Sequence, residues 1–481
     1  MRVMLRCFAR SWVVTLAVTG LATMALVVSA AAQPIPPNVD VSVMRGNEAE
    51  NAIAINPTDP MNIVAMSVLP DVVSGTFEGV SFDGGNTWTR QIIGAGDALG
   101  EVCCDQQLAW DRYGNLWMVY LLNTNGNVPI AVSTDGGLSF TKVTEIVPTT
   151  PTGSRSPKGA KPKRLRGGNR GTASADQPSI SVGPNSVWVS YTSYPSTVVQ
   201  ASGAPVSGLG QFGSFTAPES VPTANGRGNY GDTAVGPDGQ VMVVYQDQTI
   251  GQGGAHIYTA VDPDGFGPAG FTVPVLLART RVGGFDYLPV QPHRSVDAEA
   301  NLAWDRSGGP HSGRVYVIWT QEVKNESDDM DIMFQYSDDN GATWTPGVRV
   351  NDDQGTNSQV NPAIALDQST GDVAISWYDA RNDLGNGGPG YTDGVPNDDV
   401  QIWATFSTDG GVSLAPNFQV SQGTSNANGA ESFFDYGDYT HAAFQSHAFY
   451  PAWSDNSNST GDNPDGKLHQ LDLFTAKVVI A

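Results

Sequence analysis

The stretch LAWDRYGNLWMVYLLNTNGNVPIAVSTDGGLSF, residues 108–140, contains the unit that decides the fold. It begins with a short apolar strand, turns at Asp, Asn and Gly, and returns as a second strand that ends in apolar and aromatic residues. A third strand then leads into the box STDGGLSF at 133–140. An apolar hairpin with such a turn is typical of antiparallel sheet, so we expect this unit to belong to a small β-sheet.

Both parts of this unit recur along the chain. The hairpin occurs in seven copies, at residues 52–68, 108–121, 178–193, 232–247, 301–320, 362–379 and 440–455. The box fits S-x-D-x-G-x-[TS]-[WFL] at residues 81–88, 133–140, 337–344 and 407–414, with a degenerate copy near 261–265. Another strand follows each box, which gives about four strands per repeat. Four-stranded repeats in series predict an all-β protein with the β-propeller fold, and seven hairpins favour seven blades over six.

The composition supports a turn-rich β protein and excludes two other classes. The chain has 481 residues, with 48 acidic and 25 basic side chains and a net charge of −23. Most of the acid is Asp, which favours turns, whereas Glu and Lys favour helices. Together with 55 Gly and 31 Pro, this excludes a mostly helical protein. A hydrophobic content of 40%, with 11 Trp, excludes a disordered chain because it is enough to build a large core.

The boxes resemble the Asp-box (BNR) repeats of the sialidase superfamily and its secreted relatives, and the resemblance covers about residues 40–478. It implies a sialidase-like propeller whose boxes lie at the outer rim and are structural. Residues 39–47 resemble the outer strand at 347–353, and the last hairpin is followed by one clear strand at 468–480. We therefore expect the N-terminal strand to complete the last blade, which closes the ring and hides both edges.

The first 32 residues have the features of a secretory signal peptide. They contain three Arg, an apolar run at 12–28 and the sequence AAA at 30–32. An uncleaved membrane anchor is the alternative, because the run is near the length of a membrane span. We expect cleavage, and with it a secreted monomer (extracellular or periplasmic) that keeps no stable membrane span. In this interpretation residues 33–481 form a single propeller domain.

One segment departs from the acidic composition. Residues 155–170, RSPKGAKPKRLRGGNR, carry seven of the 25 basic side chains and no acidic one. Pro and Gly predict a flexible insertion between blades, at about 151–172. It could bind an anionic polymer or lie on the acidic body, but a plain exposed insertion is the simpler interpretation. It lacks the aromatic residues of single-stranded nucleic-acid grooves, so we expect no nucleic-acid partner.

Acidic residues precede most of the inner strands, a position that faces one mouth of the channel in a propeller. The expected substrate-binding carboxylates are Glu50, Asp105, Asp176, Asp232 and Asp297, in a ring with Glu48, Glu299, Asp435 and Asp438. Each Asp could instead only cap its own loop. In the functional interpretation, like charges raise one another's pKa or hold a cation, for which oxygen ligands would select Ca²⁺ or Mg²⁺.

Sialidases hold the carboxylate of their substrate with three Arg, but the three motif positions carry no Arg here. They correspond to residues 49–53, to residues 245–248, and to Asp329 or Asp399. The alternatives that could bind substrate at the mouth are Arg45, Arg227 and Arg294. An acidic mouth without the Arg triad should repel the carboxylate of a sialate.

Other parts of the sialidase pattern are present. The family uses an Asp acid/base and a Tyr nucleophile paired with a Glu. The resemblance implies that the acid/base is Asp71, that the nucleophile is Tyr436 or Tyr439, and that its partner is Glu431 or Glu299. We therefore expect the chain to bind or hydrolyse glycans at the mouth, as exo-sialidases and other glycoside hydrolases do. The alternative is a non-catalytic binding propeller that holds calcium. In either case the partners would be glycans or cell-surface glycoconjugates.

Two acidic loops are candidates for calcium binding, although no motif requires a cofactor. The first supplies Asp383, Asp398 and Asp399, and the second contains Asp455, Asp462 and Asp465. Their oxygen ligands suit Ca²⁺, but neither loop has the spacing of an EF-hand. Solvated loops without a metal are the alternative interpretation.

The adjacent Cys103 and Cys104 lie just before the second inner strand, close to the predicted mouth. In an oxidising compartment we expect them to form a vicinal disulfide that stiffens the loop. A pair of free thiols, a soft-metal site and intermolecular bridging are the other interpretations.

Overall fold

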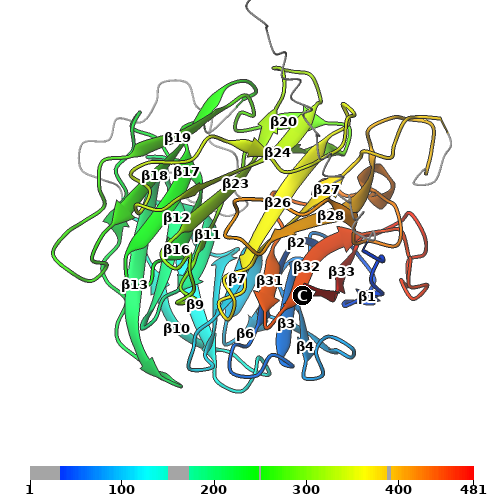
Figure 1. Cartoon of the computed structure of the whole chain (residues 1–481). Coiled ribbons are helices and arrows are strands. Elements are labelled where there is room, and N and C mark those ends of the chain that lie inside the picture. Colours follow the sequence, from blue (N-terminus) through cyan, green and yellow to red (C-terminus); the bar gives the residue numbers. More distant parts are fainter. Residues whose placement is uncertain (1–32, 150–172, 249–250, 387–391, 481) are drawn as a thin grey trace, which may run out of the picture. The chain divides into compact units, whose positions relative to one another are not determined.

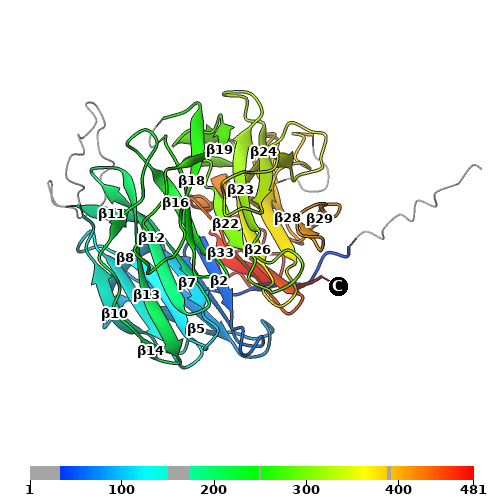
Figure 2. The ribbon, with the colours of Figure 1, turned by 60° about the vertical axis from the view of Figure 1, so that its left-hand side comes forward.

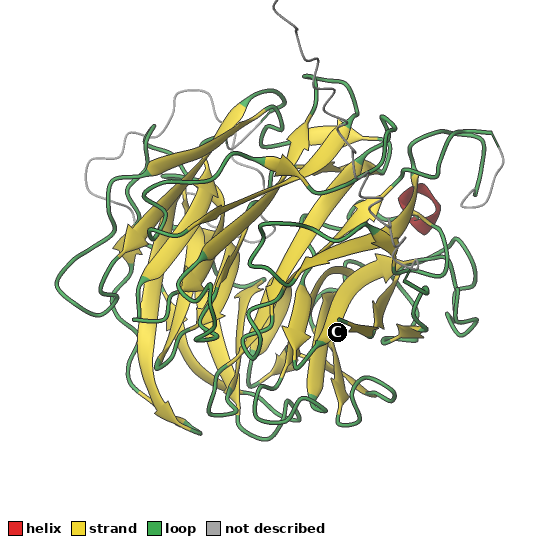
Figure 3. Ribbon diagram, viewed as in Figure 1, coloured by secondary structure: helices red, strands yellow, loops and turns green. Residues whose placement is uncertain are grey.

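The structure is a computed structural model that describes residues 33–149, 173–248, 251–386 and 392–480. From Ile35 onward the chain forms a seven-bladed β-propeller of antiparallel sheets (Figures 1 and 3). The predictions of an all-β fold and of seven blades are both confirmed. The predicted signal peptide at 1–32 and the basic insertion at 151–172 lie outside the described residues. Within the described ranges, no helix is long and apolar enough to cross a membrane.

Each blade starts with its inner strand and adds strands outward. Blade 1 comprises β2 (Ala49–Ile55), β3 (Ile63–Val68), β4 (Thr76–Ser81) and β5 (Thr89–Ile93). Blade 2 comprises β7 (Gly100–Trp110), β8 (Leu116–Leu122), β9 (Val128–Ser133) and β10 (Thr141–Ile146), with β6 (Ala95–Asp97) beside β7. Blade 3 comprises β11 (Ser174–Val182), β12 (Ser186–Tyr194) and β13 (Val198–Gly208), with β14 (Gln211–Phe212) and β15 (Glu219–Ser220) beside β13. Blade 4 comprises β16 (Asn229–Val235), β17 (Val241–Gln246), β18 (Ala255–Asp262) and β19 (Val275–Thr280).

The second half of the ring adds three blades, one inserted hairpin and one short helix. Blade 5 comprises β22 (Asn301–Trp304), β23 (Val315–Glu322), β24 (Met330–Ser337) and β25 (Val348–Arg349). Blade 6 comprises β26 (Gln359–Leu366), β27 (Val373–Asp379), β28 (Asp399–Ser407) and β29 (Phe418–Gln419), with β30 (Ser425–Asn426) beside β28. Blade 7 comprises β31 (Ala442–Gln445), β32 (Ala448–Asp455), β33 (Asp472–Ala476) and β1 (Asn38–Asp40), with β34 (Val478–Val479) beside β32. The hairpin of β20 (Asp286–Leu288) and β21 (Gln291–Val296) precedes blade 5, and the 3-10 helix η1 (Ala427–Ala430) precedes blade 7.

The N-terminal strand closes the ring, as the sequence predicts. Strand β1 pairs antiparallel with β33, with Asn38 opposite Ala476. The Asn38 side chain also donates to the carbonyl of Val420 in blade 6 at 3.0 Å. On the other side, Arg90 of blade 1 donates to the carbonyl of Val41 at 2.7 Å. The closing strand is therefore held by its own blade and by both neighbouring blades.

The core lies between the faces of neighbouring blades. One cluster of buried apolar side chains joins blades 7 and 1, another joins blades 1 and 2, and the others continue round the ring. Trp117 and Trp453 are fully buried in corresponding second strands, and their indole N–H groups donate to Asp111 and Asp455 at 2.9 and 3.0 Å. A buried Trp contributes a large apolar area, and its N–H usually needs a hydrogen-bond partner. The Asp beside each Trp supplies this partner inside the core.

The four boxes form the same hydrogen-bonded turn after the third strand of their blades. In the first box, Ser81 Oγ accepts the N–H of Gly85 at 2.9 Å, and Asp83 Oδ1 accepts the N–H of Thr87 at 2.9 Å. The same bonds recur in the other three boxes, around Asp135, Asp339 and Asp409. The boxes are therefore structural turns, as the resemblance implies.

Candidate functional site

The seven inner strands surround the central channel, each in contact with the next (Figures 1 and 2). They are β2, β7, β11, β16, β22, β26 and β31. Because every blade has the same antiparallel order, the first residues of these strands meet at one end of the channel, which we call the mouth. The hairpin turns and the Asp boxes lie at the opposite end.

Five of the described inner strands, and the segment directly before a sixth, β22, share a backbone irregularity at the mouth. Residues other than glycine adopt a positive φ there, between 35° and 56°: Glu50, Asp105, Gln177, Tyr230, Glu299 and Asn361. In five of these strands the pairing register shifts at this point, as it does at a β-bulge. Such conformations cost about 1–3 kcal/mol each and are concentrated at functional sites. Their repetition at one mouth indicates that the backbone is shaped for a site.

Arg294 lies among the carboxylates of the mouth. The β20–β21 hairpin supplies this residue, so it does not come from an inner strand. Its Nε donates to Asp438 Oδ1 at 2.5 Å, and its Nη2 contacts the other oxygen, Asp438 Oδ2. The same Nη2 also donates to Glu50 Oε1 at 3.3 Å. The guanidinium carbon also lies 4.7 Å from the centre of the Phe434 ring. Carboxylates from blade 1 and from the segment before blade 7 therefore share one cation.

The carboxyl groups around Arg294 have raised pKa values. Burial raises the pKa of Glu50 to about 8, although Arg294 opposes the rise. Burial also raises the pKa of Asp105 to about 7, and the negative charge of Asp176 adds to it. For the same reason the pKa of Glu299 lies well above its ordinary value. Near neutral pH, Glu50 and Asp105 at the mouth therefore remain partly protonated.

Several buried polar atoms of the mouth have no hydrogen-bond partner among the described residues. They are Glu50 Oε2, Gln106 Oε1, Gln177 Oε1, Asn229 Nδ2, Glu299 Oε2 and Tyr439 OH. Buried polar groups in folded proteins nearly always have a partner. Because these donors and acceptors gather at one end of the channel, they can serve a polar ligand.

Other carboxylates of the predicted ring hold backbone segments in place. Asp232 Oδ2 accepts the N–H of Leu302 at 2.7 Å and so joins blade 4 to blade 5. Asp435 Oδ2 accepts the N–H groups of His293 and Arg294 at 2.7 and 2.8 Å. These bonds fix the hairpin that presents Arg294, so Asp232 and Asp435 have a structural role at the mouth.

Asp176 and Asp297 also lie at the mouth, but Glu48 does not. Burial raises the pKa of Tyr194 well above its ordinary value, and the charges of Asp176 and Asp297 add to this rise. Glu48 instead accepts a hydrogen bond from Ser42 at 2.8 Å, in the seam where β1 closes the ring. The expected place of Glu48 in the ring of carboxylates is therefore wrong, because the neighbours of this side chain are Ser42, Asp40 and Asp472 of the seam.

The two candidate tyrosines have different surroundings. Tyr439 is buried beside the mouth, where burial and the charges of Asp105 and Glu50 raise its pKa well above the ordinary value. Tyr436 stacks on Tyr378 with 4.4 Å between ring centres and is fully buried. The Tyr436 hydroxyl donates to Ser425 Oγ at 3.2 Å, and no described contact joins this residue to the cluster around Arg294, so its catalytic assignment stays a prediction.

Four other predicted site residues make no described contact with the cluster around Arg294. Asp71 is exposed and accepts both the backbone and the side-chain N–H of Asn47 at 2.9 Å. Arg45 is exposed and pairs with Asp465 at 3.1 Å. Glu431 is exposed at the end of η1, and Arg227 is half-buried without an ion pair among the described residues.

Some mouth residues were not predicted from the sequence. Gln177 occupies the same place in the third repeat as Glu50 and Asp105 occupy in the first two. An alignment of the repeats by their turns could therefore have identified Gln177. His293 and Phe434 belong to the inserted hairpin and to the segment before blade 7. Because these segments lie outside the repeats, no periodic signal marks them.

The structure brings together the members of two other predicted groups. Cys103 and Cys104 are joined by a disulfide within β7, directly before Asp105. Oxygen atoms of Asp383, Asp398 and Asp399 all lie within 4.8 Å of one another, and all three side chains are buried. The second acidic loop is dispersed: Asp455 binds the indole of Trp453 and Asp465 binds Arg45.

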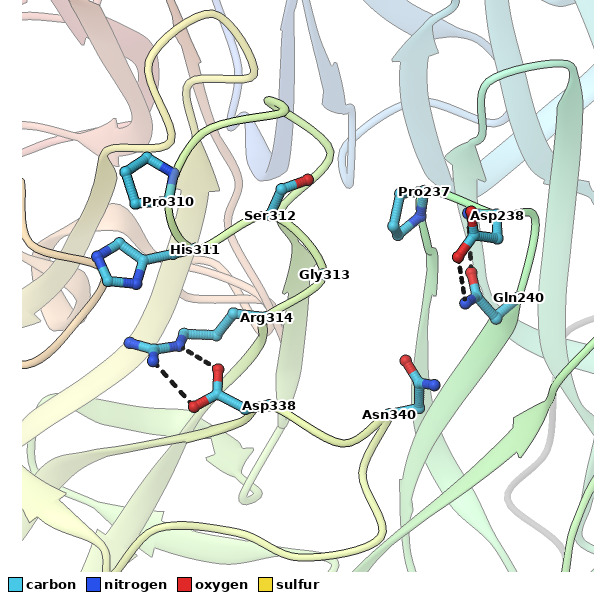
Figure 4. Close-up of a pocket in the computed structure, with 10 residues that line it drawn as sticks. All are labelled: Pro237, Asp238, Gln240, Pro310, His311, Ser312, Gly313, Arg314, Asp338 and Asn340. Atoms are coloured by element: carbon cyan, nitrogen blue, oxygen red, sulfur yellow. Dashed lines mark hydrogen bonds and ion pairs between the residues drawn. The ribbon is translucent and has the colours of Figure 1, made fainter.

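A separate polar hollow of about 450 Å³ lies at the end of the propeller opposite the mouth (Figure 4). Turns of blades 4 and 5 line it, with Asp238 and Gln240 facing His311, Arg314 and Asp338. Its charged groups already have partners, since Arg314 donates to both oxygens of Asp338 at 2.7 and 2.9 Å. The hollow is therefore a weaker candidate for ligand binding than the mouth.

The fold and the mouth together define a propeller with an acidic, polar site at one end of its channel. Similar solved structures include a protein of unknown function from Dyadobacter fermentans, with 12% identity, coverage of 93% of this chain and 99% of that one, and a TM-score of 0.48. Others are an α-L-arabinofuranosidase from Fusarium graminearum (12% identity, 72% and 92% coverage, TM-score 0.44) and the Hadza microbial sialidase (13% identity, 87% and 74% coverage, TM-score 0.43). At these identities the likeness concerns the propeller fold alone. No protein-family model and no curated protein sequence matches the chain.

Proposed function

We propose that the mouth binds neutral sugar residues of a glycan. The observation that carries this proposal is the gathering of buried polar atoms without partners around one Arg–carboxylate cluster. A sugar hydroxyl both donates and accepts, so it suits a site that holds protonated carboxyls, ionised carboxylates and amides together. The side chains of Asp438 and Arg294 keep 12% and 20% of their exposure, so a ligand would reach them first.

A neutral ligand fits the charge of the mouth better than a sialate. Arg294 already uses its guanidinium on Asp438 and Glu50, whereas a free substrate carboxylate needs an Arg that is not yet paired. Neither Arg45 nor Arg227 reaches this cluster in the described structure. The surrounding carboxylates would also repel an anion.

Hydrolysis of a glycosidic bond is the second candidate function, and the arrangement of Glu50 and Asp438 favours it. Both contact the same guanidinium, but Glu50 has a pKa of about 8 whereas Asp438 forms a two-armed ion pair. Glycoside hydrolases commonly use one protonated and one ionised carboxyl group. In this proposal Glu50 acts as the acid and Asp438 as the base or nucleophile.

A glycan array followed by titration tests the binding proposal. We expect the protein to bind a neutral glycan, and Asp438→Asn and Glu299→Gln to weaken this binding at least tenfold, which is about 1.4 kcal/mol. Asp238→Asn, in the hollow at the opposite end, is the matched control and should bind as the parent does. Retention of full affinity by both mouth variants would contradict the proposal.

A panel of fluorogenic aryl glycosides and one sialoside tests hydrolysis separately. We expect turnover of a neutral glycoside that Glu50→Gln reduces about 100-fold or more, which is within the range of general-acid catalysis, and no turnover of the sialoside. If no glycoside is turned over while the array still shows binding, the hydrolysis proposal is wrong and the binding proposal stands.

A further inference from the structure

The described residues at the two ends of the segment between β27 and β28 bring three carboxylates together. Because β27 runs towards the mouth, this loop lies at the mouth end of blade 6. Asp383 Oδ2 accepts the N–H groups of Asp398 and Asp399 at 2.8 and 3.0 Å, which draws the two ends of the loop together. Oxygens of all three residues then lie within 4.8 Å of one another.

One oxygen of this group is buried and has no hydrogen-bond partner. It is Asp398 Oδ1, on a residue that keeps only 5% of its exposure. The ion pairs of the described residues do not involve the three carboxylates, since the nearby Arg381 pairs with Asp379 and Asp352. Three buried acidic groups therefore face one another without a positive charge among the described residues, and one of them carries an oxygen without a partner.

We propose that Asp383, Asp398 and Asp399 bind a calcium ion. The available ligands are oxygens, which select hard cations such as Ca²⁺ or Mg²⁺ and not zinc. Oxygens on opposite sides of one Ca²⁺ lie about 5 Å apart, because each Ca–O distance is about 2.3–2.6 Å. The oxygens of the three residues lie within 4.8 Å of one another, so one ion could contact all of them. Ca²⁺ also accepts irregular geometry, whereas Mg²⁺ requires a near-ideal octahedron. Water would complete the coordination.

The ion would stabilise one wall of the mouth. Asp399 Oδ1 accepts a hydrogen bond from Asn426 Nδ2 at 3.0 Å, and Asn426 caps η1 through a bond to the N–H of Asn428 at 3.0 Å. Helix η1 packs against β21, the strand that carries Arg294. Calcium would thus link the blade 6 loop to the segment that presents Arg294. The site itself does not depend on the proposed glycan binding.

Metal content and thermal unfolding of the full chain test this proposal. The protein is stripped with EGTA, dialysed against Ca²⁺ or Mg²⁺, and analysed for bound metal by mass spectrometry. We expect one Ca²⁺ per chain at this site, and a rise in Tm of about 3 °C or more at saturating Ca²⁺, because a ligand that binds the folded state raises stability. Mg²⁺ should give a smaller shift.

Three variants distinguish this site from others. Asp398→Asn should lose the Ca²⁺-dependent shift in Tm. Asp393 is an exposed residue of the same loop outside the trio, so Asp393→Asn should keep the Ca²⁺-dependent shift in Tm. Glu50→Gln, at the mouth, should also keep this shift, because the ion binds at the trio and not at the mouth. No bound Ca²⁺ and no shift in the parent would overturn the proposal, even if Asp398→Asn fails to fold. A shift that survives Asp398→Asn, or that Glu50→Gln abolishes, would overturn it as well.

Discussion

Single residues at the mouth combine backbone strain with unusual protonation. The six positive-φ residues depart from the conformations that side chains other than glycine prefer, and two of them, Glu50 and Asp105, are also acidic and buried. Natural proteins keep such strain where a side chain must take a particular position. The strain and the chemistry can be separated experimentally, because substitution can change one without the other.

Glycine and alanine at position 50 should differ in a way that reports the strain. Both substitutions remove the carboxyl group, but only glycine adopts the φ of 53° without a steric cost. We expect Glu50→Ala to be less stable than Glu50→Gly by about 1 kcal/mol, measured by urea unfolding. At Thr89, an exposed residue of β5 without a positive φ, the order should be reversed. Equal stability of the two variants at position 50 would show that the backbone there is not strained.

The stability of the parent should fall as the pH rises from about 4.5 to 8. Glu50 has a pKa of about 8 in the folded chain and about 4.3 in an unfolded one. The folded state therefore binds more protons between these values, and the resulting stability is complete below the lower pKa and lost as the pH passes the higher one. Asp105, with a pKa of about 7, acts in the same direction.

Thermal unfolding between pH 5 and pH 8.5 measures this effect. Glu50→Gln should show a flatter dependence than the parent, because the amide at position 50 releases no proton over this window and only Asp105 still contributes. A parent whose Tm rises throughout the window would contradict the raised pKa values.

The sequence could predict which residues precede the inner strands, but not how their side chains point. It identified most of the mouth carboxylates because each lies at a fixed place relative to a repeated hairpin, and it identified Arg294 because this residue precedes an inner strand in the sequence. It could not distinguish Tyr436 from Tyr439, which lie in one motif. Gly437, with a φ of 90°, turns the chain between them, and Tyr436 stacks on Tyr378, which is far away in the sequence.

At the scale of elements, local patterns predicted the structure and long-range contacts did not. The hairpins and boxes depend on nearby residues, so their repeats gave the propeller and its seven blades. The bulges of the inner strands depend on neighbouring blades, as the bond from Gln177 N–H to Asp105 Oδ2 at 3.0 Å illustrates. The β20–β21 hairpin interrupts the repeat and has no counterpart elsewhere in the described chain.

The Asp boxes should contribute to stability and not to ligand binding. In the second box, Asp135 accepts a backbone N–H and a hydroxyl from Ser139, at 3.0 and 2.5 Å. We expect Asp135→Ala to lower the free energy of unfolding by about 1–2 kcal/mol, because it removes two hydrogen bonds that each contribute about 0.5–1.5 kcal/mol. Glycan binding should be unchanged on the array.

The degenerate box in blade 4 supplies the matched comparison. Asp264 accepts a single backbone N–H, from Ala269 at 3.3 Å, so Asp264→Ala should destabilise the protein less than Asp135→Ala does. Chemical denaturation measures both variants. An effect at Asp264 as large as that at Asp135 would mean that the hydrogen bonds of the box are not the source of its stability.

At the scale of the whole molecule, the seam that closes the ring contains another group of buried acids. Asp40, Glu48 and Asp472 keep 2%, 0% and 0% of their exposure, and they connect β1 and the following loop with β33. Burial raises the pKa of Asp472 to about 12, and its neighbours Asp40 and Glu48 add to the rise. Asp472 is therefore protonated at neutral pH, and its O–H is available to donate within the seam.

Because Asp472 is protonated, an amide should replace this acid without loss of stability. Asp472→Asn remains neutral and keeps a hydrogen-bond donor, so at pH 8 its Tm should equal or exceed that of the parent. Asp472→Ala removes the donor and should lower the free energy of unfolding by about 1–3 kcal/mol, because it leaves buried carboxyl oxygens unsatisfied. Differential scanning calorimetry at pH 5 and pH 8 compares the three proteins. If Asp472→Asn is much less stable than the parent at pH 8, Asp472 must be ionised there and a cation must hold the seam together.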